Sequence, residues 1–144
     1  MITTENLEQA KRLIRKEEHP IIIKAQDEQF NRKILEYGHF DVLLWLELQP
    51  QKSSLRQLNS GFNEVLAKIA KANSISLGID LDAIRKLNKT QQAEVLSRIR
   101  QNIFLCRKAG LNLAFYKKED KLAILSFMLA LGASTNQASQ TIYF

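Results

Sequence analysis

Two acidic residues, Asp80 and Asp82, have side chains and a position that could support catalysis. They directly follow an apolar run at 74–79, which is predicted to form a strand. Parallel α/β proteins hold their catalytic groups at the carboxyl ends of strands, so either carboxylate could ligate magnesium there. The competing interpretation, which we favour, is that one of them caps the short segment that follows. Because no H-x-H, H-E-x-x-H, C-x-x-C or glycine-rich phosphate loop accompanies them, the sequence predicts no catalytic residue, metal site or cofactor.

The remaining residues with reactive side chains favour structural roles. His19 and His39 each lie at the end of a predicted helix and before a strand. That is the amino edge of a sheet, where a histidine usually caps a helix or interacts with its dipole. Cys106, the single cysteine, falls on the apolar side of a helix and is expected to be a buried structural thiol.

The cellular location is predicted from what the sequence lacks. One cysteine cannot form an internal disulfide, which favours a reducing compartment. The charged beginning of the chain has no signal-peptide core, and no apolar run is long enough to span a membrane. We therefore expect a cytoplasmic protein with no membrane partner.

Positive charge is concentrated in one part of the chain. The net charge is +6, and residues 83–118 contain nine Lys and Arg but only one acid, Glu94. This imbalance favours an anionic partner, with nucleic acid first, although a merely solvated surface is the competing interpretation. The candidate RNA-binding residues in this segment are Arg98, Arg100, Arg107, Lys108, Lys117 and Lys118. No aromatic-rich strand motif for base stacking is present, so RNA contacts are expected to involve backbone and shape.

These residues must be positioned by helices and strands that alternate along the chain. Helices are predicted at 4–18, between Asp27 and Gly38, and at 61–73, 89–109 and 119–132, with short segments at 80–87 and after Ser134. Strands are predicted at 21–25, 41–46, 74–79 and 111–116. The alternation predicts an α/β fold with four parallel strands and right-handed crossovers, in an open sheet or part of a barrel. We expect one domain over 1–144, with an N-terminal helix at 1–19 and the partial barrel at 20–144.

The predicted helix at 89–109 has the clearest boundary signals. Asn88 and Gln91 have the spacing of a capping box, and Gly110 ends the helix. Arg100 and Arg107 are seven residues apart and therefore share one side. Arg98 and Lys108 are expected to point further outward.

Three segments of the sequence resemble one protein family. They are SGFNEVLAKIAKANSISLGI at 60–79, RIRQNIFLCRKAGLNLAF at 98–115 and ILSFMLALGASTNQAS at 124–139, with a weaker likeness at 21–47. The chain resembles ribonuclease P protein component 3, the archaeal counterpart of the thirty-kilodalton subunit of the nuclear enzyme. The resemblance extends over nearly all of the chain from residue 21.

The resemblance implies a fold and a function. It implies a TIM-like barrel related to polymerase-and-histidinol-phosphatase domains but without their metal ligands. It also implies a subunit that is not an enzyme on its own, working beside the ribonuclease P RNA that removes the 5′ leader of precursor tRNA. The implied partners are that RNA, protein component 2 and, indirectly, precursor tRNA. Within the matched segments, Lys68 joins Arg98, Arg100, Arg107 and Lys108 as a candidate RNA-binding residue.

The chain departs from the family pattern in several places. It lacks the first strands of the barrel. The basic pattern usually found before Ser60 is reduced to Arg56, which remains a candidate RNA-binding residue, and Glu64 occupies the position of a family histidine. The Arg-Asp pair that usually opens the late helix is absent, and Lys117, Lys118 and Lys121 lie nearby instead.

Two other functions remain open from the sequence. One is a scaffold that binds only protein, and the other is a small metal-dependent α/β hydrolase that uses Asp80 or Asp82. In either case a half-sized barrel exposes sheet edges and inner apolar surface. We expect a partner chain, either component 2 or a second copy of this chain, to cover that surface.

Overall fold

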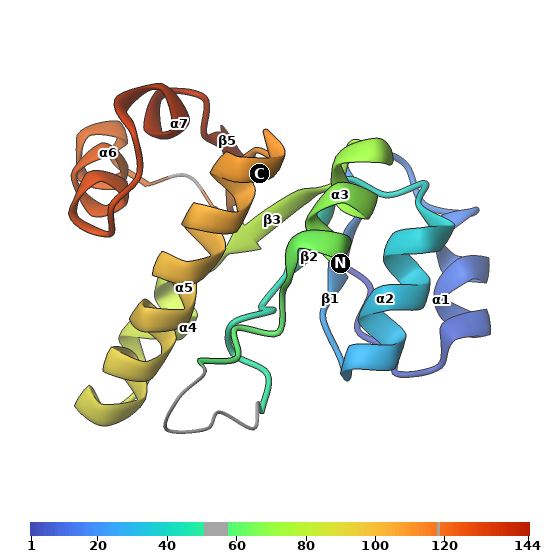
Figure 1. Cartoon of the computed structure of the whole chain (residues 1–144). Helices are drawn as coiled ribbons and strands as arrows, with labels where there is room; N and C mark the ends of the chain where they lie inside the picture. Colours follow the sequence, from blue (N-terminus) through green and yellow to red (C-terminus); the bar gives the residue numbers. More distant parts are fainter. Residues whose placement is uncertain (51–57, 118) are drawn as a thin grey trace.

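The computed structural model describes residues 1–50, 58–117 and 119–144, in which helices and strands alternate. The helices are α1 (Leu7–Ile14), α2 (Glu28–Tyr37), α3 (Glu64–Ala72), α4 (Leu81–Arg85), α5 (Lys89–Ala109), α6 (Lys121–Ala130) and α7 (Thr135–Ser139). The strands are β1 (Ile22–Lys24), β2 (Val42–Leu44), β3 (Ser76–Ile79), β4 (Leu113–Phe115) and β5 (Ile142–Tyr143). The α/β class predicted from the sequence is confirmed (Figure 1).

The sheet has the strand order of a barrel but is not closed. All its strands are parallel, and each pairs with the next in the chain, in the order β1-β2-β3-β4-β5. Successive helices pack side by side as well, α1 on α2, α2 on α3 and α3 on α5. Strands in chain order with helices outside them are the arrangement of a partial TIM-like barrel.

The two faces of the sheet alternate residue by residue, as strand geometry requires. Ile23, Leu43 and Leu77 belong to the large core beneath the helices. Their neighbours on the other face form a smaller core cluster of Ile22, Val42, Leu44 and Ala114.

Gly78 allows the strands to approach closely on the inner face. A Cβ atom at this position would lie 2.6 Å from Val42 Cγ1 and 2.8 Å from Leu44 Cδ1. Both side chains are buried, so neither can move aside freely, and only glycine fits. Gly78 therefore serves the close packing of β3 against β2.

Helix α5 begins and ends where the sequence predicted. The Asn88 side chain accepts a hydrogen bond from the Gln91 backbone N–H, and the Gln91 side chain accepts one from the Asn88 backbone N–H. Gly110, with φ 68°, ends the helix in the left-handed conformation, which glycine adopts without strain.

Two elements differ from the prediction. Helix α1 ends at Ile14, although the sequence suggested 4–18, because residues 15–20 are all exposed and offer no apolar side chain to the core. Strand β5 was not predicted, since two residues show no periodicity. It forms because Lys117 N–H donates to Phe144 O at 2.7 Å and Phe144 N–H donates to Phe115 O at 3.0 Å.

The inner face is less exposed than a half-sized barrel led us to expect. Ile22, Val42, Leu44 and Ala114 are at most 8% exposed, and Trp45, Tyr116 and Phe144 pack against them. The expectation of a large exposed inner apolar surface was therefore wrong for the described residues, apart from the partly exposed Ile142. Among these residues, no helix is both long and apolar enough to cross a membrane.

Candidate nucleic-acid interface

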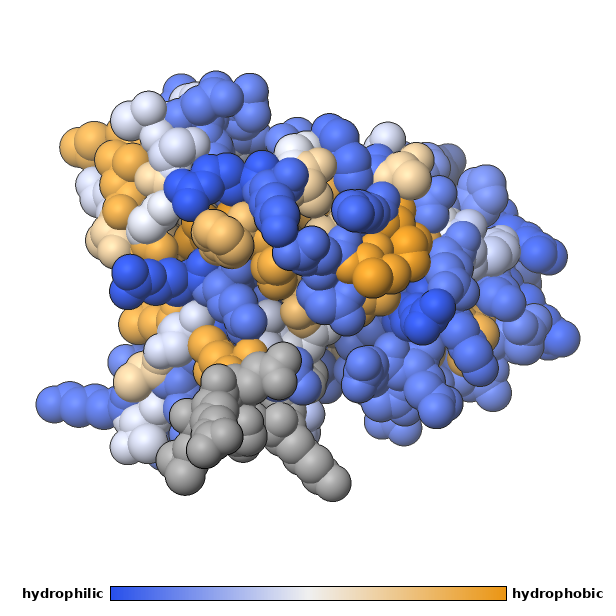
Figure 2. Space-filling model, viewed as in Figure 1, coloured by the Kyte–Doolittle hydropathy of each residue, from blue (hydrophilic) through white to orange (hydrophobic). Residues whose placement is uncertain are grey.

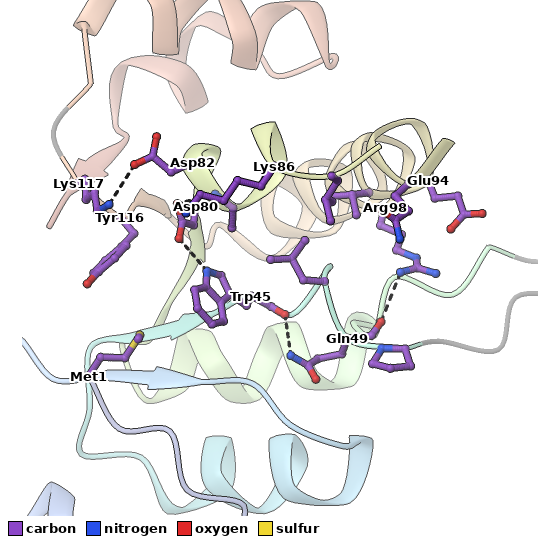
Figure 3. Close-up of a pocket in the computed structure, with 16 residues that line it drawn as sticks. Met1, Trp45, Gln49, Asp80, Asp82, Lys86, Glu94, Arg98, Tyr116 and Lys117 are labelled. Carbon is purple, nitrogen blue, oxygen red and sulfur yellow. Dashed lines mark hydrogen bonds and ion pairs between the residues drawn. The ribbon is translucent and has the colours of Figure 1, made fainter. Parts of the chain in front are cut away.

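The carboxyl ends of three neighbouring strands meet at one edge of the sheet. Trp45 follows β2, Asp80 follows β3, and Tyr116 and Lys117 follow β4. Together they border a cleft of about 790 Å³, which we call the carboxyl-edge cleft. Figure 3 shows this cleft with α4 and α5 along one side of it. This is the edge at which parallel α/β folds bind their ligands.

Both acids at this edge already have partners. Asp80 is buried; its Oδ2 accepts a hydrogen bond from Trp45 Nε1–H at 3.0 Å, and its Oδ1 accepts one from Ala83 N–H at 3.2 Å as the N-cap of α4. The prediction of a capping role is thus confirmed for Asp80. Asp82 pairs with Lys117 at 3.0 Å and with Arg85 at 3.1 Å.

These contacts leave little chemistry for a hydrolase. The hydrogen bond and charge of Lys117, with those of Arg85, lower the pKa of the Asp82 carboxyl, so it is a poor general acid near neutrality. In the part of the chain that the structure describes, no three His, Cys, Asp or Glu side chains are grouped so as to hold a metal ion.

Aromatic side chains gather at the carboxyl edge, which sequence reasoning did not predict. Trp45, Tyr116 and Phe144 come from the ends of three strands and pack against the same inner cluster. Lys24 Nζ lies 5.3 Å from the centroid of the Trp45 ring, a cation–π contact. The available signal was positional, because Trp45 and Tyr116 each lie at or near the carboxyl end of a predicted apolar strand.

Arg98 does not point outward as predicted. It is half-buried, and its Nη1 donates to the backbone oxygens of Glu47 at 3.1 Å and Gln49 at 3.4 Å. The guanidinium turns inward because it supplies hydrogen-bond donors to these backbone acceptors after β2. Arg98 therefore holds the chain after β2 against α5, and this leaves it poorly placed as an RNA contact.

The other candidate residues of α5 lie on two flanks of that helix. Arg100 and Arg107 are exposed on one flank, where Arg107 Nη1 donates to Gly132 O at 3.4 Å. Lys108 lies on the flank toward α3, where it forms an ion pair with Glu64, and exposed Lys68 is on the same helix as Glu64. Phe104, which is 55% exposed, contacts the Arg107 guanidinium.

The remaining candidates are separate from these flanks. Lys117 borders the carboxyl-edge cleft and pairs with Asp82. Lys86, which the sequence analysis did not select, is exposed at the same cleft. Arg56 and Lys118 lie outside the described residues. The structure therefore divides the predicted set into an exposed group on α5 and α3 and a group at the cleft.

A buried acid, Glu47, was also missed. It is 2% exposed, and its Oε1 has no hydrogen-bond partner among the described residues. Burial, with a smaller contribution from the charge of Asp80, raises the pKa of its carboxyl to about 7. It lies close to Asn102 of α5 in a tightly packed part of the interior. Its position at the end of an apolar strand segment was the one signal of burial that the sequence offered.

The histidines lie at the amino edge, as predicted, but His19 does not end a helix. Its Nδ1 is 2.6 Å from Asp41 Oδ2, which also accepts a hydrogen bond from Ile21 N–H. His39 contacts Tyr37 edge-on, with ring centroids 5.4 Å apart.

Cys106 is buried, as predicted, and burial raises the pKa of its thiol to about 12. A protonated, enclosed thiol is unreactive.

Comparison with known proteins finds similarity among solved structures. No protein-family model matches the sequence, and no curated protein matches it either. A chain from the cryo-EM structure of archaeal ribonuclease P with mature tRNA has a similar structure, with a TM-score of 0.76 at 20% sequence identity. The match covers 96% of this chain and 61% of that chain. Likeness at this identity shows the fold. It confirms the partial TIM-like architecture, and this chain spans 61% of the length of the one it matches.

Proposed function

We propose that this chain is a protein subunit of ribonuclease P that assists the RNA subunit in removing the 5′ leader of precursor tRNA. The observation that carries the proposal is the structural match, at a TM-score of 0.76 over 96% of the chain, to part of an archaeal ribonuclease P bound to tRNA. The distribution of charge and the state of the acids add to it.

The charge supports a partner rich in phosphate. Residues 83–118 carry nine cations and one acid, and on α5 Arg100 and Arg107 are exposed without a carboxylate partner among the described residues. Uncompensated cations on a helix attract a nucleic-acid backbone and release its counterions. The hydrolase alternative loses support, since Asp80 and Asp82 are both engaged in hydrogen bonds or ion pairs.

A protein partner is supported by helix α6. Leu122 and Leu129 of this helix are 69% and 40% exposed, and Phe127 is half-buried. Figure 2 shows apolar side chains gathered over α6. A helix that is apolar on nearly every side is normally covered. We propose that protein component 2 covers it, and a second copy of this chain is the competing occupant.

Reconstitution tests the proposal directly. The purified chain is added to the cognate ribonuclease P RNA and component 2, and cleavage of precursor tRNA is measured at low magnesium concentration. Stimulated cleavage supports a role as a subunit, and no stimulation overturns it. Binding of component 2 without any effect on RNA association or cleavage would instead identify a scaffold that binds only protein.

A further inference from the structure

We propose that the carboxyl-edge cleft binds an unpaired nucleobase of an RNA strand. This inference rests on the proposed function for the source of the RNA. It goes beyond that function by adding base contacts to a protein whose other cations suit only the phosphate backbone. Stacking platforms of this kind combine aromatic rings with nearby cations.

One ring of the aromatic wall of the cleft, that of Trp45, is held by two side-chain contacts. Trp45 is held by its Nε1–H donation to Asp80 Oδ2 at 3.0 Å and by the contact of Lys24 with its ring. Its backbone has φ 66°, a conformation that costs a non-glycine residue energy and that clusters at ligand sites. Figure 3 shows Tyr116 beside Trp45 at one end of the cleft. Rings fixed before binding lose little entropy when a base stacks on them.

The charges around the cleft favour a base over a phosphate inside it. Among the described residues, the charged side chains of the lining are three cations and three acids, so their formal charges sum to zero; they are Lys86, Arg98, Lys117, Asp80, Asp82 and Glu94. A neutral, partly apolar cleft suits an uncharged heterocycle, whose amino groups can donate to Glu94. The volume of about 790 Å³ is sufficient for one nucleotide, since small-molecule sites are commonly of about 300–1,000 Å³.

A phosphate can be bound at the mouth of the same cleft. Lys86 is exposed there and has no ion-pair partner in the described part of the chain. From Lys86 the chain leads through Lys89 into α5. A strand with one base in the cleft would therefore continue toward the exposed cations of that helix.

The site contains its own reporter, because Trp45 is the only tryptophan in the chain. The full chain is titrated with a single-stranded oligoadenylate, with a duplex of equal length and with adenosine monophosphate, and tryptophan fluorescence is followed. We expect the oligoadenylate to quench the fluorescence, the duplex to leave it unchanged, and the mononucleotide to bind more weakly than the strand. Quenching by the duplex, or tighter binding of the mononucleotide, would overturn the proposal of a strand-borne base.

Substitutions at Tyr116 test whether its ring stacks on the bound base. Tyr116→Leu should weaken oligoadenylate binding about fivefold or more, the loss of one stacking partner, whereas Tyr116→Phe keeps the ring and should keep the affinity. Tyr37→Leu, the same change at the amino edge of the sheet beside His39, is the matched control and should leave oligoadenylate binding unchanged. Equal weakening by Tyr37→Leu, or an unchanged affinity in Tyr116→Leu, would contradict the assignment.

The test of the base site and the test of the proposed function can fail independently of each other. If precursor-tRNA cleavage is stimulated but oligoadenylate leaves Trp45 fluorescence unchanged, the base site is wrong and the subunit role stands. If the strand quenches Trp45 but cleavage is never stimulated, the subunit role fails and base binding stands. Quenching caused by component 2 alone, with none from RNA, would make the cleft a protein contact and overturn the inference.

Discussion

At the scale of single residues, Glu47 makes the stability of the fold depend on pH. Its carboxyl is buried and its pKa is raised from 4.5 to about 7. Because the folded state holds this proton more tightly than the unfolded state, the stabilisation is complete below pH 4.5 and is lost as pH rises through about 7. Such a rise in pKa changes the free energy of unfolding by roughly 3 kcal/mol between these pH limits.

The variant Glu47→Gln should remove this dependence. We expect it to be more stable than the parent at pH 8 and to approach the parent at pH 5, as measured by urea unfolding at both values. Glu18→Gln, the same change at an exposed position, is the control and should shift stability little at either pH. A parent protein as stable at pH 8 as at pH 5 would show that Glu47 is hydrated or paired in solution.

At the scale of secondary-structure elements, Gly78 sets how closely β3 lies against β2. In Gly78→Ala the new methyl group would overlap Val42 Cγ1 and Leu44 Cδ1, and overpacking of this kind costs about 1–3 kcal/mol. Urea unfolding should show that decrease in stability. In a Val42→Ala background the same substitution should cost less, because the overlap with Val42 is gone. Equal costs in the two backgrounds would mean that the strain arises elsewhere.

Helix α5 should carry most of the electrostatic attraction to RNA. In Arg100→Glu/Arg107→Glu, two exposed cations are reversed, so RNA should bind more weakly. The slope of log affinity against log salt should flatten by about one for each phosphate that the variant no longer neutralises. The affinity is measured by filter binding over a range of salt concentrations.

The control variant Lys16→Glu/Lys33→Glu makes the same change of net charge on exposed residues away from α5. If both double variants flatten the slope equally, only the overall charge matters.

The sequence predicted some elements well because their signals are local. Helix α5 has a long apolar period, a capping box at Asn88 and a terminal glycine, and its observed bounds equal the predicted ones. Strand β5 depends on two hydrogen bonds to β4 and the residue after it, which no local pattern specifies. Arg98 turned inward for the same reason, since the carbonyls that it satisfies come from the segment after β2.

At the scale of the whole molecule, the site was less predictable than the fold. The alternation of helices and strands is sufficient to predict a parallel sheet. The meeting of Trp45 and Tyr116 at one cleft, by contrast, depends on β2, β3 and β4 being adjacent in that order. The sequence alone revealed the cations of α5 but neither these rings nor the buried carboxyl of Glu47. Each of those two features arises from tertiary packing.

The placement of charge and apolar surface predicts how the molecule is assembled into a complex. Substituting Leu122→Asp/Leu129→Asp inserts charge into the exposed apolar side of α6, so the variant should bind component 2 at least about tenfold more weakly, since central apolar anchors commonly contribute that much. Calorimetric titration measures the weakening, and circular dichroism checks the fold. Val65→Asp, at a residue of α3 that is 58% exposed, is the matched control and should bind normally. Unchanged binding of component 2 with disappearance of a self-associated form in light scattering would assign α6 to a second copy instead. In either case RNA would bind at α5 and at the carboxyl-edge cleft, because no described residue of α6 lines that cleft.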